Sequence, residues 1–190
     1  KNYKLLEGFI ADEIRSDIQN LFGNGFLSMG GVSIKTSINT NLQQKSKDLL
    51  VSELTNLDIK NNNIKPPIFN SNIKNFDKID WENFFKKNKK KISNNIWDLG
   101  VIKKNNDGKY LLRTDKSDIL LNLKFPYEKP PVFSSGDVVY YTFDKDKKNL
   151  TYKQIPFFDG GIIILDRKLD EILVLNGGFN YLSSNLNMVT

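Results

Sequence analysis

The stretch Gly160-Gly-Ile-Ile-Ile-Leu-Asp-Arg-Lys-Leu-Asp-Glu-Ile-Leu-Val-Leu-Asn-Gly-Gly-Phe-Asn180 decides the fold at the end of the chain. Its two apolar runs, Ile162–Leu165 and Ile172–Leu175, flank the polar segment Asp166–Glu171. Two short apolar runs on either side of a polar turn predict a β-hairpin, and the unbroken apolar character predicts that both strands are buried.

Two amphipathic helices and a strand are predicted before this hairpin. Apolar residues at helical spacing indicate one helix over about 9–22 and another over about 41–57, the second capped by Asn39 or Thr40. The alternation in Val32–Ser37 predicts a strand with one face inward. We expect this strand to share a sheet with the hairpin, and helix 41–57 to pack on that sheet. The residues that set the helical patterns are Phe9, Ile10, Ile14, Ile18, Leu21 and Phe22, then Leu42, Leu49, Leu50, Leu54 and Leu57.

The middle of the chain changes from a polar tract to a β pattern. Residues 58–91 are rich in Asn and Lys and contain Pro66-Pro67, so we expect a loop with a short helix near 80–87. Five short strands follow, and Asn-Asn-Asp-Gly at 105–108 is a specific hairpin signal between two of them. Five such strands fit a small barrel of the oligonucleotide/oligosaccharide-binding (OB) type, although an SH3-like barrel or a bare meander fits nearly as well. The predicted strands are 96–103, 109–113, 118–125, 137–143 and 150–155.

The composition excludes several kinds of chemistry. The 190 residues contain no Cys and no His, which excludes disulfides, Cys or His zinc sites and Ser-His-Asp catalysis. The net charge of +6 is compatible with nucleic acid, anionic lipid or an acidic polymer and selects none of them. We expect no cofactor, no metal and no membrane span, and the start at Lys1 rather than Met suggests an excised piece.

Several segments together resemble the class A, bifunctional penicillin-binding proteins of the 1A type. Gly31-Val-Ser-Ile-Lys-Thr-Ser-Ile-Asn-Thr-Asn-Leu-Gln43 is similar to that family's Gly-Leu-x-Val-x-Thr-Thr-Leu-Asp-x-x-Leu-Gln, which is the first strand and helix of the transpeptidase domain. The other similar segments are Phe9-Ile-Ala-Asp-Glu-Ile-Arg15, Gly136-Asp-Val-Val139, Tyr152-Lys-Gln-Ile-Pro156, the Gly160–Asn180 hairpin and Leu186-Asn-Met-Val-Thr190. Their order and spacing carry the resemblance over roughly residues 9–57 and 136–190.

The chain departs from the family pattern at three places. The hairpin turn usually reads Lys-Thr-Gly, where this chain has Lys168-Leu-Asp170. Asn176 stands where an Ala usually precedes the Gly-Gly pair, and Met188 replaces the usual Arg.

The resemblance implies an α+β fold in which a five-stranded OB-like barrel is inserted into a helix–strand–helix plus β-hairpin scaffold. Residues 1–31 would be the linker helix region and 32–58 the first strand and helix of the transpeptidase scaffold. Residues 59–158 would be the inserted OB-like domain with its Asn/Lys-rich first segment, and 159–190 the scaffold hairpin, ending before the catalytic serine.

The function implied is that of a non-catalytic fragment. Its parent would be a periplasmic enzyme anchored in the bacterial inner membrane, which polymerises glycan strands from lipid II and crosslinks peptidoglycan through a penicillin-sensitive serine. The OB-like domain would space the parent's domains and dock a regulatory lipoprotein or a cell-wall protein.

Sequence fragments of the family's catalytic motifs occur, and we expect them to be chance matches, so that the chain has no catalytic residues. Ser71-Asn-Ile-Lys74 matches Ser-x-x-Lys but lies in the Pro/Asn loop rather than on a helix. Lys35-Thr-Ser37 lacks the glycine of the Lys-Thr-Gly motif. Ser183-Ser-Asn185 matches the family's third motif, Ser-x-Asn. A self-contained serine-lysine hydrolase using Ser71 and Lys74 is the alternative that these matches leave open.

A basic OB-fold nucleic-acid-binding module is the other alternative. The lysines between 86 and 91 could attract a polyanion, and aromatic residues of the β region could stack on bases. We expect instead solvated lysines, aromatic side chains in the core or at the rim, and no specific nucleic acid binding. Tyr140 and Tyr141 must point to opposite faces of their strand, so at least one of them is predicted to be exposed.

Overall fold

The structure is a computed structural model that describes residues 8–31, 33–91, 96–104, 109–115, 121–129, 131–143, 149–181 and 187–189. The chain forms two compact units. The hairpin unit comprises Lys1–Leu54 and Phe158–Thr190, and the barrel unit comprises Thr55–Phe157. The first division falls inside a helix, a few residues before the boundary at 59 that the sequence suggested.

The hairpin unit contains two helices whose ends are set by particular residues. Helix α1 (Gly8–Phe22) ends at Gly23, which has a φ of 86° and donates its N–H to the Gln19 carbonyl. Helix α2 (Thr40–Lys60) begins after Asn39, whose Oδ1 accepts from the N–H groups of Asn41 and Leu42. Both helices were predicted within three residues at each end, and a short 3₁₀ turn, η2 (Phe26–Met29), follows the first.

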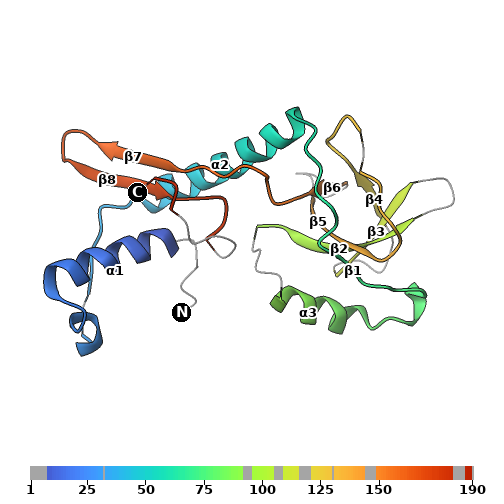
Figure 1. The fold of residues 1–190 in the computed structure, drawn as a ribbon, viewed down its shortest axis with the longest axis horizontal. Helices are drawn as coiled ribbons and strands as arrows, with labels where there is room; N and C mark the ends of the chain where they lie inside the picture. Colours follow the sequence, from blue (N-terminus) through green and yellow to red (C-terminus); the bar gives the residue numbers. More distant parts are fainter. Residues whose placement is uncertain are drawn as a thin grey trace. The chain divides into compact units, whose positions relative to one another are not determined.

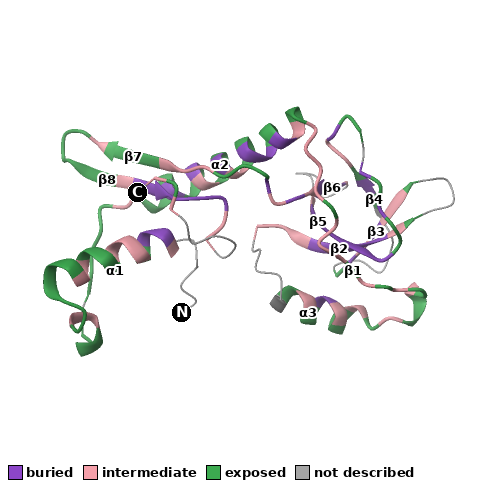
Figure 2. Ribbon diagram, viewed as in Figure 1, coloured by how far each residue is buried: buried purple, intermediate pink, exposed green. Residues whose placement is uncertain are grey.

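The predicted hairpin is present, but its burial differs from the expectation. Strands β7 (Ile162–Asp166) and β8 (Glu171–Asn176) pair antiparallel. Val174 and Leu175 of β8 are buried, whereas the middle of β7 is exposed, as Figure 2 shows. The expectation that both strands are buried is therefore wrong, because the core of this unit contacts only one end of β8. That core contains Phe9, Ile10 and Leu175, with Ile14, Ile38, Tyr181 and Val189 packed against it.

The strand expected at Val32–Ser37 does not form in residues 33–37, and Val32 lies outside the described residues. The segment still lies beside β8, since Ser37 Oγ donates to the Ile172 carbonyl and the Asn39 N–H donates to the Leu173 carbonyl. One of these two bonds comes from a side chain, so they do not make the alternating backbone ladder that defines a strand. The leucines of α2 also differ from expectation: Leu50 and Leu54 are buried, but Leu42, Leu49 and Leu57 are exposed.

The barrel unit contains the five predicted strands in the predicted order. They are β2 (Asp98–Lys104), β3 (Tyr110–Thr114), β4 (Leu121–Lys124), β5 (Asp137–Phe143) and β6 (Leu150–Lys153) (Figure 1). The order around the barrel is β5-β2-β3-β4-β6, and β6 pairs with β5 to close it. All these pairs are antiparallel except β4 with β6, which is the mixed connectivity of an OB barrel. The α+β fold class and the closed five-stranded barrel are thus confirmed; the Asn105–Gly108 turn lies outside the described residues.

Both faces of the barrel sheet are covered. The inner face holds a core of side chains from all five strands. Gly100 faces this core, and a larger residue would overlap Leu112 there, because an added Cβ would lie 2.6 Å from Leu112 Cγ. The outer face is covered by the segment before β2, which forms β1 (Phe69–Asn70), the 3₁₀ turn η3 (Phe76–Lys78) and helix α3 (Trp81–Lys91). The inner core is Ile102, Leu112, Leu123, Tyr127, Phe133, Val139, Tyr141, Leu150 and Tyr152.

Because α3 and the segment before it cover the outer face, the prediction that Tyr140 or Tyr141 is exposed is wrong. Tyr141 points into the barrel and is 0% exposed, and Tyr140 packs with the outer cluster around Phe85 and is 5% exposed. The two side chains do point to opposite faces, but no sequence pattern indicated that α3 covers the second face. Helix α3 begins at the cap Asp80, whose Oδ1 accepts from the Asn83 N–H.

Candidate functional site

Two of the motif-like serines, Ser71 and Ser37, make hydrogen bonds to the backbone. Ser71 follows β1, and its Oγ donates to the Gly136 carbonyl at 2.6 Å, whereas Lys74 is exposed in the next loop. A serine nucleophile requires a base within hydrogen-bond reach, and Lys74 does not occupy that position. Ser37 Oγ donates a hydrogen bond to the Ile172 carbonyl of β8. Ser183–Asn185 lie outside the described residues.

Some of the lysines of α3 are exposed to solvent, and another is ion-paired. Lys86 and Lys87 are exposed, while Lys89 forms ion pairs with Asp98 and Asp115. The side chains of Lys90 and Lys91 lie outside the described residues. In the part of the chain that the structure describes, no group of acidic residues could hold a metal ion.

A buried polar network joins α2 to β8 in the hairpin unit. The Gln43 carboxamide accepts from the Leu175 N–H at 3.0 Å and donates to the Leu175 carbonyl at 2.9 Å, so it pairs with that residue as a strand would. It also donates to Asn176 Oδ1, and Asn176 in turn donates to the Gln43 carbonyl and to Ser46. Both side-chain polar atoms of Asn176, which differs from the Ala of the resembled family, are therefore hydrogen-bonded.

The departure in the hairpin turn also has a structural counterpart. Asp170 has a φ of 55°, a left-handed conformation that glycine adopts most easily, and the family pattern has Gly at this position. Asp166 stabilises the same turn by accepting at Oδ1 from the N–H of Lys168 at 2.8 Å and from that of Leu169.

Lys47 is a half-buried cation in this unit. Its Nζ donates to the carbonyls of Gly178 and Phe179, and Asp159 Oδ1 accepts from the Phe179 N–H. Burial lowers the pKa of Lys47 to about 8, and the nearby Asp159 carboxylate opposes this shift.

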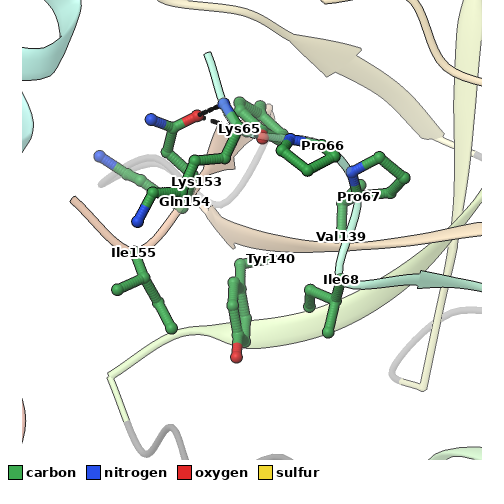
Figure 3. A pocket seen from close by; sticks show the side chains of 10 residues that line it. Lys65, Pro66, Pro67, Ile68, Val139, Tyr140, Lys153, Gln154 and Ile155 are labelled. Atoms are coloured by element: carbon green, nitrogen blue, oxygen red, sulfur yellow. Dashed lines mark hydrogen bonds between the residues drawn. The ribbon is translucent and has the colours of Figure 1, made fainter. Parts of the chain in front are cut away.

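A groove of about 210 Å³ opens on the barrel unit, and sequence reasoning did not identify it. It forms where β1 and β6 pair with successive parts of the same edge of β5. Figure 3 shows Pro66 and Pro67 on one side, and the Tyr140 ring between Ile68 and Ile155. The groove is lined by Lys65, Pro66, Pro67, Ile68, Val139, Tyr140, Tyr152, Lys153, Gln154 and Ile155.

One buried amide holds the walls of this groove together. Gln154 Oε1 accepts from the Lys65 N–H at 2.9 Å, and its Nε2 donates to the Asn63 carbonyl and to Asp58 Oδ2. Asp58, which is 1% exposed, also accepts from the Phe157 N–H at 3.0 Å. The two chain segments that begin and end the unit are therefore fastened to each other by side-chain hydrogen bonds, which makes the groove a fixed feature of the barrel.

The groove carries two lysines. Lys65 Nζ donates to the Pro156 carbonyl at 2.8 Å and lies 4.7 Å from the centroid of the Phe157 ring. Burial lowers the pKa of both Lys65 and Lys153; Asp58 opposes the shift at Lys65, while at Lys153 burial is the whole cause.

The α+β arrangement, with its closed OB-type barrel between the parts of a helix-and-hairpin unit, is a fold seen in penicillin-binding proteins. A crystal structure of penicillin-binding protein 1A from Haemophilus influenzae matches with a TM-score of 0.74 and 15% sequence identity, over 96% of this chain and 27% of that one. At this identity the similarity shows the fold, and this chain spans about a quarter of the solved one. No protein-family model matches the chain, and no curated protein matches its sequence.

Proposed function

We propose that the chain is the non-catalytic linker and OB-domain part of a bifunctional, class A penicillin-binding protein of the 1A type. The observation that carries this proposal is the match of 96% of the chain, which includes residues of both units, to one solved penicillin-binding protein 1A. The ordered sequence segments that resemble the same family support it independently.

In this proposal the parent polymerises and crosslinks peptidoglycan from the periplasmic side of the inner membrane. None of the helices that the structure describes has the length and apolar character of a membrane span. Residues 32–58 and 159–190 would begin its transpeptidase domain, and 59–158 would be the inserted domain. The inserted domain would dock a regulatory lipoprotein or cell-wall protein, and lipid II would reach the parent through its other domains.

The exposed face of β7 supports the view that the hairpin is the beginning of a larger sheet. Ile163, Ile164 and Leu165 are exposed on β7, and an exposed apolar strand is a site for further pairing or packing. Further strands of a transpeptidase domain would cover it.

The nucleic-acid alternative lacks such support. Stacking on bases requires exposed aromatic rings, but Tyr127, Phe133, Tyr141 and Tyr152 lie in the barrel core. The aromatic side chains therefore support a structural role.

Covalent labelling with a fluorescent penicillin tests the proposal. We expect no labelling of the 190-residue chain, and labelling of the full-length gene product at a serine outside these residues. Ser71→Ala in the full-length protein should leave the labelling unchanged, because Ser71 Oγ is bonded to the Gly136 carbonyl. Labelling of the short chain, loss of labelling on Ser71→Ala, or a full-length protein that penicillin does not label would each overturn the proposal.

A further inference from the structure

The ammonium group of Lys153 is a charge that the fold of the barrel unit does not use. Lys153 is the last residue of β6, and because side chains alternate along a strand it points outward where Tyr152 points into the core. It is half-buried in the groove, and no carboxylate or hydrogen-bond acceptor among the described residues pairs with it. A partly desolvated cation without an anion is unfavourable, and a bound carboxylate would relieve that cost.

The surface next to this charge is apolar. The Tyr140 ring and the side chains of Ile68 and Ile155 lie along one side of the groove, with Pro66 and Pro67 opposite (Figure 3). The groove therefore combines an apolar surface with a cation at its edge.

The volume of the groove limits how large a bound group can be. Sites for cofactors and drug-sized molecules usually have volumes of about 300–1,000 Å³. At about 210 Å³ this groove suits one or two side chains of a longer molecule that lies mostly outside it. The hydrogen bonds of Gln154 to both walls hold it in shape without a ligand, which lowers the cost of ordering on binding.

We propose that this groove binds an extended peptide segment of an acidic protein partner, with an apolar side chain on Tyr140 and the prolines and a neighbouring Asp or Glu carboxylate on Lys153. The net charge of +6 on the chain favours approach of an acidic partner. The site gives the docking role proposed for the barrel unit a particular location and chemistry, yet it depends only on the geometry of that unit.

A titration followed by amide chemical shifts of the whole 190-residue chain tests the site. The probe is acetyl-Gly-Leu-Glu-Gly-amide, and its matched control carries Gln in place of Glu. We expect shifts at Ile68, Val139, Tyr140, Lys153 and Ile155, with the Glu peptide binding about 5–10-fold more tightly than the Gln peptide, as one partly buried ion pair provides.

Two charge-removing variants separate the site from general electrostatic attraction. Lys153→Met keeps most of the apolar stem, and we expect it to bind both peptides with the weak affinity of the Gln peptide. Lys87→Gln removes one charge from the exposed surface of α3 and should leave the preference for Glu unchanged. The amide spectra of the free variants report whether each is folded.

Three results would overturn the proposal. They are no shifts in the groove at millimolar peptide, equal affinity for the Glu and Gln peptides, and tighter binding of octanoate than of the Glu peptide at the same residues. The last result would identify a lipid-like carboxylate in place of a peptide. These outcomes are independent of penicillin labelling, so the failure of one proposal is distinguishable from the failure of the other.

Discussion

The barrel unit closes its sheet, whereas the hairpin unit leaves its sheet open. In the barrel unit β6 returns to pair with β5, and both faces of the sheet are covered by apolar clusters. Among the described residues of the hairpin unit, β7 and β8 pair only with each other, and β7 keeps exposed apolar residues. The barrel therefore has the features of a self-contained fold, whereas the exposed apolar face of β7 is typical of a strand that packs against further structure.

The two units also stabilise their interiors differently. The barrel core is almost entirely apolar and aromatic, whereas the contact of α2 with β8 depends on the amides of Gln43 and Asn176. Loss of apolar volume in the barrel core should therefore destabilise the barrel, and loss of the Gln43 carboxamide should destabilise the hairpin unit.

The largest effect is expected for Leu112→Ala. Leu112 is 0% exposed in the barrel core, and removing such a side chain usually costs about 2–5 kcal/mol of unfolding free energy. Denaturant unfolding followed by tryptophan fluorescence measures this effect on the barrel alone, because the two tryptophans of the chain, Trp81 and Trp97, both lie in that unit.

A substitution at Gly100 tests the packing around Leu112 with the same unfolding measurement. Gly100→Ala alone should destabilise the barrel by about 1–3 kcal/mol because its Cβ would overlap Leu112, but should cost much less in the Leu112→Ala background. Additive effects of the two changes would show that Gly100 does not face Leu112. Leu111→Ala, at a partly exposed position of the same strand, is the control and should cost less than Leu112→Ala.

A smaller effect, confined to the hairpin unit, is expected for Gln43→Ala. This change removes the Gln43 side-chain partner of the Leu175 N–H and carbonyl and the donor to Asn176 Oδ1, at a cost of about 2 kcal/mol. Amide hydrogen exchange of β8 should become faster, and the tryptophan-monitored unfolding of the barrel should not change. Gln44→Ala is the matched control, because the exposed Gln44 bonds only to Asp48 among the described residues. Equal effects of the two changes would contradict the role of Gln43.

The last effect appears only at alkaline pH and involves Lys47. Because burial lowers its pKa to about 8 in the folded unit, the unfolded chain binds more protons than the folded one between about pH 8 and the ordinary lysine value. Stability of the hairpin unit should therefore rise with pH across this range, and Lys47→Met should remove the rise. Exchange protection of β8 in the two proteins at pH 8 and pH 10 measures the difference. A parallel pH dependence in both proteins would contradict it.

The elements were more predictable from the sequence than their burial and pairing. Helical periodicity and alternation placed α1, α2 and β2–β6 because local backbone preference sets them. The parallel contact of β4 with β6 and the cover that α3 gives Tyr140 depend on residues distant in sequence, and no local pattern reports them.

The features of the sites were harder to predict. The signal for the Gln43 network was present, since Gln43 and Ser46 lie on the same helical face as Leu50 and Leu54 and are buried with them. The groove had no comparable signal, because it exists only where β1 and β6 meet the same edge of β5.

Amide hydrogen exchange of the whole chain, resolved by strand, tests most directly the claim that a complete barrel accompanies an unfinished sheet. We expect slow exchange in β2 and β5, which have partner strands on both edges, and fast exchange in β7, which has one partner strand among the described residues and is largely exposed. Exchange in β7 as slow as in β5 would show instead that the hairpin belongs to a complete core in the 190-residue chain.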